Sequence, residues 1–245
     1  MNLERHIDNA TAAFTAAYGK VDAWRTEKVA AFEKYHKDAL RLTEDAAVEE
    51  NARLVKLYAD KYESIEKTLL SELAEIEAAY SAEVRDFYTP DGAAIDAADN
   101  ALLNAGILTV QELVEMVTKH AENPTMLRII ERYSKAQRIE NIPDDTWVTM
   151  TMAQSGGKTE TKIFDTFKQL ALAPVHLAAS ENVGREVFLK AALSLDDYAE
   201  NARINLLKAK LVLTDIEKEA LQQAEHKRMV AQNGGYNPHA AADSQ

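Results

Sequence analysis

The first third of the chain contains almost none of the residues that interrupt helices. Residues 1–88 include one glycine, Gly19, and no proline, whereas all five prolines and the other seven glycines come later. Glycine and proline are the residues that most often end or bend a helix, so this segment is predicted to form long helices with few breaks. Pro90 and Gly92 then mark a predicted boundary just after it.

Apolar side chains recur along the second half of this segment with a helical period. The series is Tyr58, Tyr62, Ile65, Leu69, Leu73, Ile76, Tyr80, Val84 and Phe87. Eight steps cover 29 residues, and 29/8 is about 3.6, the period of a nearly straight helix rather than the 3.5 of a heptad coiled coil. The other faces are rich in Glu and Lys, so the helix is predicted to bury one narrow seam against a partner.

Two partners are open for this seam. Residues 3–42 carry a similar apolar stripe, and Thr43 is a suitable N-cap for a second helix after a chain reversal, which would give a helical hairpin. Without the reversal, residues 1–88 would form one continuous arm whose seam packs on a neighbouring chain. The sequence therefore predicts a long helical arm or hairpin.

Beyond residue 88 the sequence predicts shorter helices from their cap signals. The signals are a stop at Gly106, a capping box of Thr109 and Glu112, and a start at Asn123 followed by Pro124. They delimit helices at about 93–105, from 110 and from 124. Further helices are predicted up to Pro174, over 195–213 and over 214–231. Residues 89–231 are thus expected to form a second, helical domain, and 232–245 a flexible tail.

One part of this second domain has the alternation of a β-strand. The residues Trp147, Thr149 and Thr151 alternate with Val148, Met150 and Met152, and the pattern resumes over 159–164. Gly156 and Gly157 lie between the two stretches, as in a tight hairpin turn. The predicted fold class is therefore mainly α, with a long N-terminal helical arm or hairpin followed by a helical domain that holds one inserted β-hairpin at about 147–164.

Composition excludes several classes of function. The chain has 28 Lys and Arg against 40 Asp and Glu, a formal charge of −12, which argues against nucleic acid as a partner. It contains no Cys, so disulfides and thiolate chemistry are excluded. No stretch reaches the roughly 18 consecutive apolar residues of a membrane span, and no secretory signal is expected at the N-terminus, so no membrane partner is predicted.

No sequence motif supports catalysis or a cofactor. Residues 155–159 resemble the end of a phosphate-binding loop, but the first glycine of that motif is replaced by Met152. Glu33 and His36 have the spacing of a di-iron ligand pair, but the second such pair is missing. His36, like His6 and His120, is expected to be solvated. The protein is predicted not to be an enzyme, with no catalytic, cofactor-binding or metal-binding residues.

Two surfaces are candidates for binding a protein partner. The first is the apolar seam, represented by Tyr58, Tyr62, Ile65, Leu69, Leu73, Ile76 and Tyr80, since Tyr is enriched at interfaces. The second is a basic stripe of Arg128, Arg132 and Lys135, which share one face of a predicted helix and suit an acidic partner. The alternatives are packing within the chain for the seam and a solvated, ion-paired face for the stripe.

The block Asn123-Pro124-Thr125-Met126-Leu127-Arg128, which follows the charged helical segment, resembles small helical proteins that tailed bacteriophages make alongside their capsid protein. The resemblance implies a non-enzymatic structural or assembly component of a viral particle, such as a minor capsid, scaffold-like or connector-associated protein. It also implies homo-oligomers, capsid or other structural proteins as partners, and location in the virion or in the host cytoplasm during assembly. The alternative is a cytoplasmic helical adaptor that binds its partner through the N-terminal arm.

Overall fold

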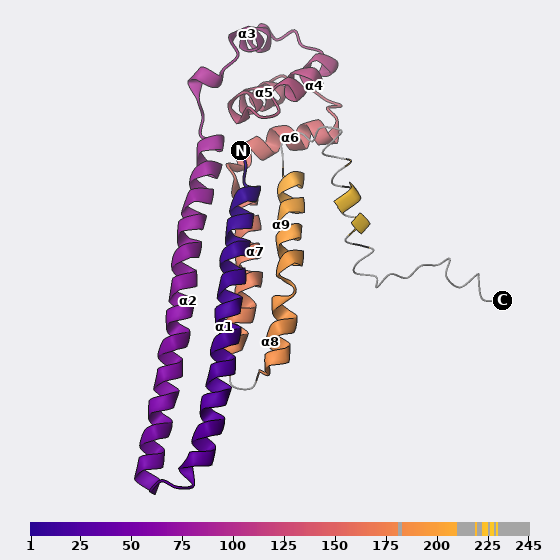
Figure 1. Ribbon diagram of the computed structural model, residues 1–245. Coiled ribbons are helices and arrows are strands. Elements are labelled where there is room, and N and C mark those ends of the chain that lie inside the picture. Colours follow the sequence, from indigo (N-terminus) through magenta and orange to yellow (C-terminus); the bar gives the residue numbers. More distant parts are fainter. Residues whose placement is uncertain (181–182, 210–218, 220–221, 225, 228, 230–245) are drawn as a thin grey trace, which may run out of the picture. The chain divides into compact units, whose positions relative to one another are not determined.

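The computed structural model is mainly helical, as the sequence predicts (Figure 1). It describes residues 1–180, 183–209, 219, 222–224, 226, 227 and 229. The elements in chain order are α1 (Glu4–Ala39), α2 (Glu44–Tyr88), the short 3₁₀ helix η1 (Gly92–Ala94), α3 (Ala97–Ala105), α4 (Val110–Lys119), α5 (Pro124–Ala136), α6 (Asp144–Ser155), α7 (Lys158–Ala179), α8 (Arg185–Ala192) and α9 (Leu195–Lys208). The predicted tail over 232–245 lies outside the described residues, and so does most of the predicted helix over 214–231.

The chain divides into two compact units. The first unit consists of Met1–Glu83 and Lys162–Ala202, and the second of Val84–Thr161 and Arg203–Gln245. The predicted division, into residues 1–88 and 89–231, follows the order of the sequence. In the structure, by contrast, residues 162–202 belong with the N-terminal helices.

In the first unit, α1 and α2 form an antiparallel hairpin, so of the two arrangements left open by the sequence the hairpin is the one observed. Near the turn, the Tyr35 hydroxyl of α1 donates a hydrogen bond to the Ala47 carbonyl of α2 at 3.0 Å. Further along, the Trp24 indole N–H donates to the Tyr58 carbonyl at 2.8 Å. Thr43 caps α2, because its Oγ1 accepts the backbone N–H of Ala46 at 3.4 Å.

Helix α7 packs along this hairpin, parallel to α1. The rings of Phe14 and Phe167 meet edge to face with centroids 5.9 Å apart, and the Tyr18 hydroxyl donates to the Ala171 carbonyl at 2.5 Å. The Arg25 guanidinium donates to the Ala178 carbonyl at 3.0 Å. All three pairs are 153 residues apart, so the two helices keep one register along this length. Figure 1 shows α7 beside α1 and α2 in this way.

Helix α7 continues through Pro174, so the prediction that a helix ends there is wrong. Proline removes one N–H from the helical ladder and crowds the preceding turn. Pro174 itself is buried, and Ala171 in the preceding turn receives the hydrogen bond from Tyr18. Packing against α1 thus supports the helix where its own ladder is weakened. Helix α8 then runs antiparallel to α1, with Phe188 against Tyr18 and Arg185 paired with Asp22.

In the second unit, α3 to α6 surround one hydrophobic core. Its buried residues are Leu103, Leu113, Met116, Val117, Met126, Leu127, Ile130, Tyr133, Met150 and Ala153. Three of the predicted cap signals are confirmed: Gly106 ends α3 in the left-handed conformation, Thr109 and Glu112 form a capping box, and Asn123 caps α5 with Pro124 in its first turn. The predicted helix over 93–105 is instead η1 followed by α3, because Asp96 breaks the run and caps α3.

The predicted β-hairpin is wrong. Residues 147–152 lie in α6, residues 158–164 lie in α7, and no strand occurs among the described residues. The hydroxyls of Thr149 and Thr151 donate hydrogen bonds to the carbonyls four residues earlier, those of Asp145 and Trp147. These bonds satisfy the hydroxyls of both β-branched residues within the helix. The buried positions of α6 are Thr146, Thr149, Met150 and Ala153, which have helical spacing. Gly156 and Gly157 do form a turn, but it joins two helices.

Candidate interaction surfaces

The predicted apolar seam of α2 is covered by helices of the same chain. Tyr58, Leu69, Leu73 and Tyr80 are buried, and the remaining members, Tyr62, Ile65 and Ile76, are half-buried. The Tyr80 ring lies 4.6 Å from the Phe164 ring of α7, measured between centroids. The structure therefore places the seam inside the first unit, in line with the intramolecular alternative.

Hydrogen bonds to main-chain carbonyls of α7 hold two tyrosines in place, Tyr62 in the seam and Tyr18 on α1. The Tyr62 hydroxyl donates to the Val175 carbonyl at 2.9 Å, and burial raises the pKa of Tyr62 to about 12. Burial also raises the pKa of Tyr18, and the nearby Tyr198 adds to the shift. Both groups stay neutral donors throughout the physiological range, so these tyrosines act as structural anchors of the bundle.

The α1–α2 hairpin extends beyond the end of α7. Helix α7 ends at Ala179, and the offset of 153 aligns this residue with position 26 of α1. On α2, the bond from Tyr62 to Val175 places the end of α7 level with about position 58. Residues 27–39 and 44–57, here called the distal hairpin, therefore lie past α7 (Figure 1).

A small aromatic core holds the distal hairpin together. Leu54 is buried within it, Trp24 and Tyr58 are buried at its base, and Phe32 and Tyr35 pack against these residues. Lys61 of α2 and Glu27 of α1 form an ion pair at 2.6 Å across the base of the distal hairpin. Only the inner side of each helix is used in this contact, since two helices alone can bury just one seam each.

The outer side of the distal hairpin carries exposed apolar side chains. Val48 and Val55 on α2 are 65% and 51% exposed, Ala52 between them is exposed, and Val29 on α1 is also exposed. We call Val29, Val48, Ala52 and Val55 the distal face. The steps of 4 and 3 between its α2 members place them on one side of the helix. The apolar tip residues Leu40 and Leu42 are exposed as well.

The distal face continues the side of the hairpin on which α7 lies. Seven residues after Val55, and thus on the same side of α2, comes Tyr62, which bonds to α7. On α1, Val29 is one turn after Arg25, which also bonds to α7. The distal face has only a weak signal in the sequence, because the strongest apolar stripe of this segment is the one that is buried.

The predicted basic stripe on α5 is largely engaged within the second unit. The Arg128 guanidinium donates to the Ala153 carbonyl at 2.8 Å, and Lys135 forms an ion pair with the buried carboxylate of Glu131. The Lys135 ammonium also lies over the Trp147 ring, 5.9 Å from its centroid. Arg132 is exposed. Two of the three predicted side chains thus stabilise the packing of α5 on α6.

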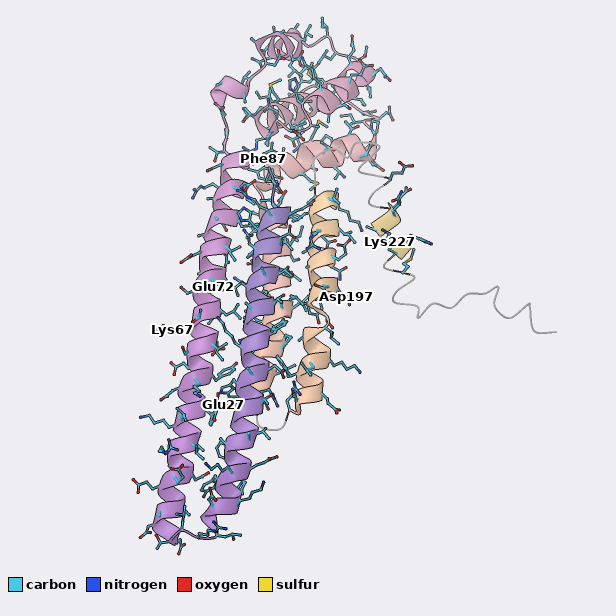
Figure 2. The ribbon with its side chains drawn as sticks, viewed as in Figure 1. Glu27, Lys67, Glu72, Phe87, Asp197 and Lys227 are labelled. Carbon is cyan, nitrogen blue, oxygen red and sulfur yellow. The ribbon has the colours of Figure 1, made fainter. Side chains whose placement is uncertain are left out.

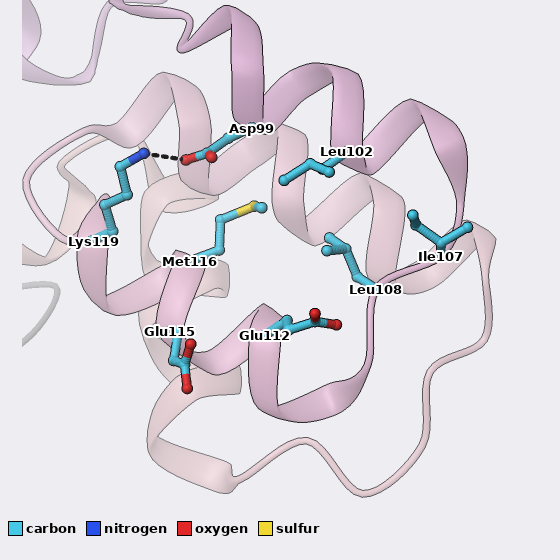
Figure 3. A pocket seen from close by; sticks show the side chains of 8 residues that line it. All are labelled: Asp99, Leu102, Ile107, Leu108, Glu112, Glu115, Met116 and Lys119. Carbon is cyan, nitrogen blue, oxygen red and sulfur yellow. Dashed lines mark hydrogen bonds and ion pairs between the residues drawn. The ribbon is translucent and has the colours of Figure 1, made fainter.

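An open pocket of about 430 Å³ lies in the second unit (Figure 3). Its apolar wall consists of Leu102, Ile107, Leu108 and Met116, and its charged groups are Asp99, Glu112, Glu115 and Lys119. Lys119 donates to the Asp99 carboxylate at 2.7 Å and to the Asp96 carboxylate at 3.0 Å. His120 lies 2.6 Å from the same oxygen of Asp99.

The charged side chains of this cluster are paired with one another. The hydrogen bond from Lys119, followed by that from His120, lowers the pKa of Asp99. Asp96, Asp99 and His120 are close enough to share a cation, and the Lys119 ammonium already sits against both carboxylates. We therefore interpret the cluster as a set of ion pairs that holds α3 against the end of α4.

The expectation that His6 and His120 are solvated is wrong. His6 is buried beside Glu83 of α2, with Nε2 3.0 Å from a carboxylate oxygen, and His120 is buried beside Asp99. Each histidine ends up inside because a carboxylate from another helix satisfies its ring nitrogen, a pairing that no local sequence pattern reveals. His36 is exposed, as expected, and so is Glu33.

Comparisons with protein-family models, with curated proteins and with solved structures find no match to this chain. Among the described residues, no helix combines the length and the apolar character needed to cross a bilayer. The charged faces of the long helices illustrate this: Lys67 and Glu72 are exposed on α2 (Figure 2).

Proposed function

We propose that this protein is a non-enzymatic structural or assembly component of a larger particle, and that it works through protein–protein contacts made by its distal hairpin. The observation that carries the proposal is the exposed apolar character of the distal face. Val29, Val48 and Val55 are each more than half exposed, on helices whose inner sides are already packed. Clustered exposed apolar residues of this kind mark interaction sites.

The free energy gained by burying apolar surface favours docking of a partner on this face. Covering a fully exposed valine side chain contributes about 1.5 kcal/mol or more, and Val29, Val48 and Val55 are 58%, 65% and 51% exposed, so covering all three contributes roughly 2.5 kcal/mol or more. The helices on which they lie are already folded against each other, so docking them orders little additional chain. A preformed helical surface of this type suits a partner that presents a helix.

The proposal that the particle is a virion follows from the resemblance of residues 123–128 to phage capsid-associated helical proteins. In the fold, Asn123 and Pro124 begin α5, while Met126 and Leu127 enter the core of the second unit. These residues support folding, so the partners would be contacted elsewhere, through the first unit. Capsid or other structural proteins of the same particle are the proposed partners, and virion or host cytoplasm is the proposed location.

The alternative is a cytoplasmic adaptor that uses the same distal hairpin to bind one protein. The two functions differ in the size of the assembly. A particle component forms part of a symmetric, high-order assembly, whereas an adaptor forms a complex of a few chains.

Gradient sedimentation of particles and lysate from the source that encodes the chain tests the proposal. We expect the wild-type chain in rapidly sedimenting particles, and the V48D/V55D chain in slowly sedimenting fractions. The control is L57D, because Leu57 is 37% exposed on the opposite side of α2. Incorporation of V48D/V55D at the wild-type level would contradict the role of the distal hairpin. Wild-type chain found only in small complexes would favour the adaptor.

A further inference from the structure

We propose that the pocket between α3 and α4 binds a segment near the C-terminus of the same chain. Met229 enters the pocket, and the basic side chains of Lys227 and Arg228 lie against its carboxylates. This inference concerns a different surface from the distal face and goes beyond the proposed function.

The pocket has apolar walls that the described residues leave open to solvent. Met116 in the wall is buried, whereas Leu102 and Ile107 are 43% and 70% exposed. Exposed apolar walls grouped in this way mark a place where another molecule or segment docks. Because the pocket is open, it suits one face of a peptide segment, whereas sites for small molecules enclose most of their ligand.

The charge of the pocket selects a basic occupant. Its wall contains three carboxylates, and the one ammonium, that of Lys119, already pairs with Asp99 (Figure 3). Residues 97–119 contain three acidic and one basic side chain, so their net charge is 1 − 3 = −2. Widening the count to 92–120 gives 1 − 4 = −3. The pocket is therefore acidic wherever its boundary is drawn, and a basic segment is its electrostatic complement.

Two carboxylates of the pocket can accept further hydrogen bonds. The backbone N–H and the hydroxyl of Thr109 both donate to Oε2 of Glu112, and the Gln111 amide donates to Oε1 of Glu115. Within the described part of the chain, each carboxylate thus uses one oxygen, and both side chains are exposed. A Lys or Arg side chain can reach the other oxygen without breaking the capping box.

One segment of the chain combines the required charge with an apolar anchor. Lys227 and Arg228 are the only two consecutive Lys or Arg residues in the sequence, and Met229 follows them directly. Residues 220–242 contain these two basic residues and one acidic residue, Glu225, so their net charge is 2 − 1 = +1. An unbranched, flexible methionine fills irregular apolar gaps well.

The segment is available and close enough to dock. Met229 is 57% exposed and Lys227 is exposed (Figure 2), and both belong to the second unit, as the pocket does. Seventeen residues, 209–225, separate the segment from the end of α9. They span about 25 Å as a helix and about 55–60 Å fully extended. A folded unit of about 100 residues has a radius of gyration near 13 Å, so the tether can reach the pocket and keeps the segment concentrated near it.

Methionine-methyl NMR of the full-length protein tests the docking from both sides. The chain has six methionines, of which Met116 lines the pocket and Met229 lies in the segment. We expect E115K, a change in the pocket, to shift the resonance of Met229. We expect K227E/R228E, a change in the segment, to shift the resonance of Met116. Loss of one exposed ion pair should lower the docking equilibrium constant about 1.5- to 5-fold.

Matched variants and salt control for a general effect of charge. E140K makes the same change in charge as E115K at an exposed residue outside the pocket, and K210E/K218E matches K227E/R228E. We expect both controls to leave the two resonances in place. Raising the salt concentration should move the wild-type Met229 resonance toward its position in E115K, since exposed ion pairs are screened.

Crosslinking supplies a second measurement. The chain has no cysteine, so I107C/M229C carries one thiol at the edge of the pocket and one in the segment. The control is V148C/M229C, because Val148 is 51% exposed on α6 and does not line the pocket. We expect a short bis-maleimide to link I107C to M229C within one chain, and to link V148C to M229C at least about fivefold less, as identified by mass spectrometry.

Two results would overturn the docking of the segment. The first is a Met229 resonance that E115K moves no more than E140K does, and the second is equal linking of the two cysteine pairs. Links between two chains in place of links within one would overturn docking in the same chain. None of these variants changes the distal face, so V48D/V55D tests the proposed function separately and either proposal can fail alone.

Discussion

At the residue scale, Gly157 occupies a site that only glycine fits. Its φ is +84°, in the left-handed region, and a methyl group there would overlap the Val84 side chain and lie 3.1 Å from the Tyr88 ring. The neighbouring Gly156 also has a positive φ, of 65°, but a methyl group there would meet nothing within 4 Å. An alanine at position 156 would therefore have backbone strain alone, whereas an alanine at position 157 would have both backbone strain and steric overlap.

We predict that Gly156→Ala costs about 1–2 kcal/mol of unfolding free energy, the price of a left-handed alanine. Gly157→Ala should cost about 1–3 kcal/mol more, because it adds overpacking to the same strain. Chemical denaturation of the two variants and the wild type measures both values. Equal costs for the two variants would show that the close approach of Gly157 to Val84 is wrong.

A second prediction at the residue scale concerns Asp99 and pH. Because Lys119 and His120 lower the pKa of Asp99, the folded chain binds fewer protons than the unfolded chain near pH 4. The stabilisation is therefore complete above the unfolded pKa of about 3.9 and is lost as the pH falls through the lower, folded value. We expect Asp99→Asn to cost about 1.5–3 kcal/mol at pH 7.

The difference between wild type and Asp99→Asn should shrink as the solution is acidified below pH 4. Urea unfolding of both proteins at several pH values, followed by circular dichroism, measures this difference. A gap that stays constant from pH 7 to pH 3 would mean that Asp99 titrates as in the unfolded chain.

At the scale of the element, α2 is a helix with one buried side over most of its length. Leu69 and Leu70 are adjacent in sequence, but Leu69 is 2% exposed and Leu70 is 45% exposed. We predict that Leu69→Ala costs about 2–5 kcal/mol, as for a leucine truncated in a well-packed core. Leu70→Ala should change the stability by no more than about 0.5 kcal/mol. Thermal or urea unfolding distinguishes the two, and similar losses would contradict the one-sided packing of α2.

Local signals in the sequence predicted those elements whose ends are fixed locally. The capping box at Thr109, the cap at Asn123 and the stop at Gly106 each act within one helical turn, and each is confirmed. The incorrect prediction of a β-hairpin over 147–164 has a local cause too. A run such as Trp147 to Met152 satisfies alternation and helical spacing at once, and the acidic first turn of α6, with Asp144 and Asp145, was the stronger clue to a helix.

The candidate surface could be predicted only in part. The periodicity of α2 located the seam that α1 and α7 cover, but a stripe says nothing about which helix covers it. The position at which α7 ends, and hence the exposure of Val48 and Val55, depends on a register between segments 153 residues apart. Helix α7 also runs through Pro174, which the local signals did not predict.

At the scale of the whole molecule, the two units differ in what each of them packs and exposes. The second unit has a closed core of its own, and its ion-pair cluster at Asp99 joins α3 to α4. The first unit has a bundle around α1, α2 and α7, and it alone carries the distal hairpin. The function we propose depends on that hairpin being covered in the native assembly.

Hydrogen exchange of the full-length chain, free and in its native assembly, measures this coverage directly. A docked helix opens less often, so its amides exchange more slowly. We predict that the amides of residues 28–39 and 44–57 exchange more slowly in the assembly than in the free chain, while those around the buried residues Leu69 and Leu73 change little. Equal exchange of the distal hairpin in both states, with protection gained only elsewhere, would contradict the account.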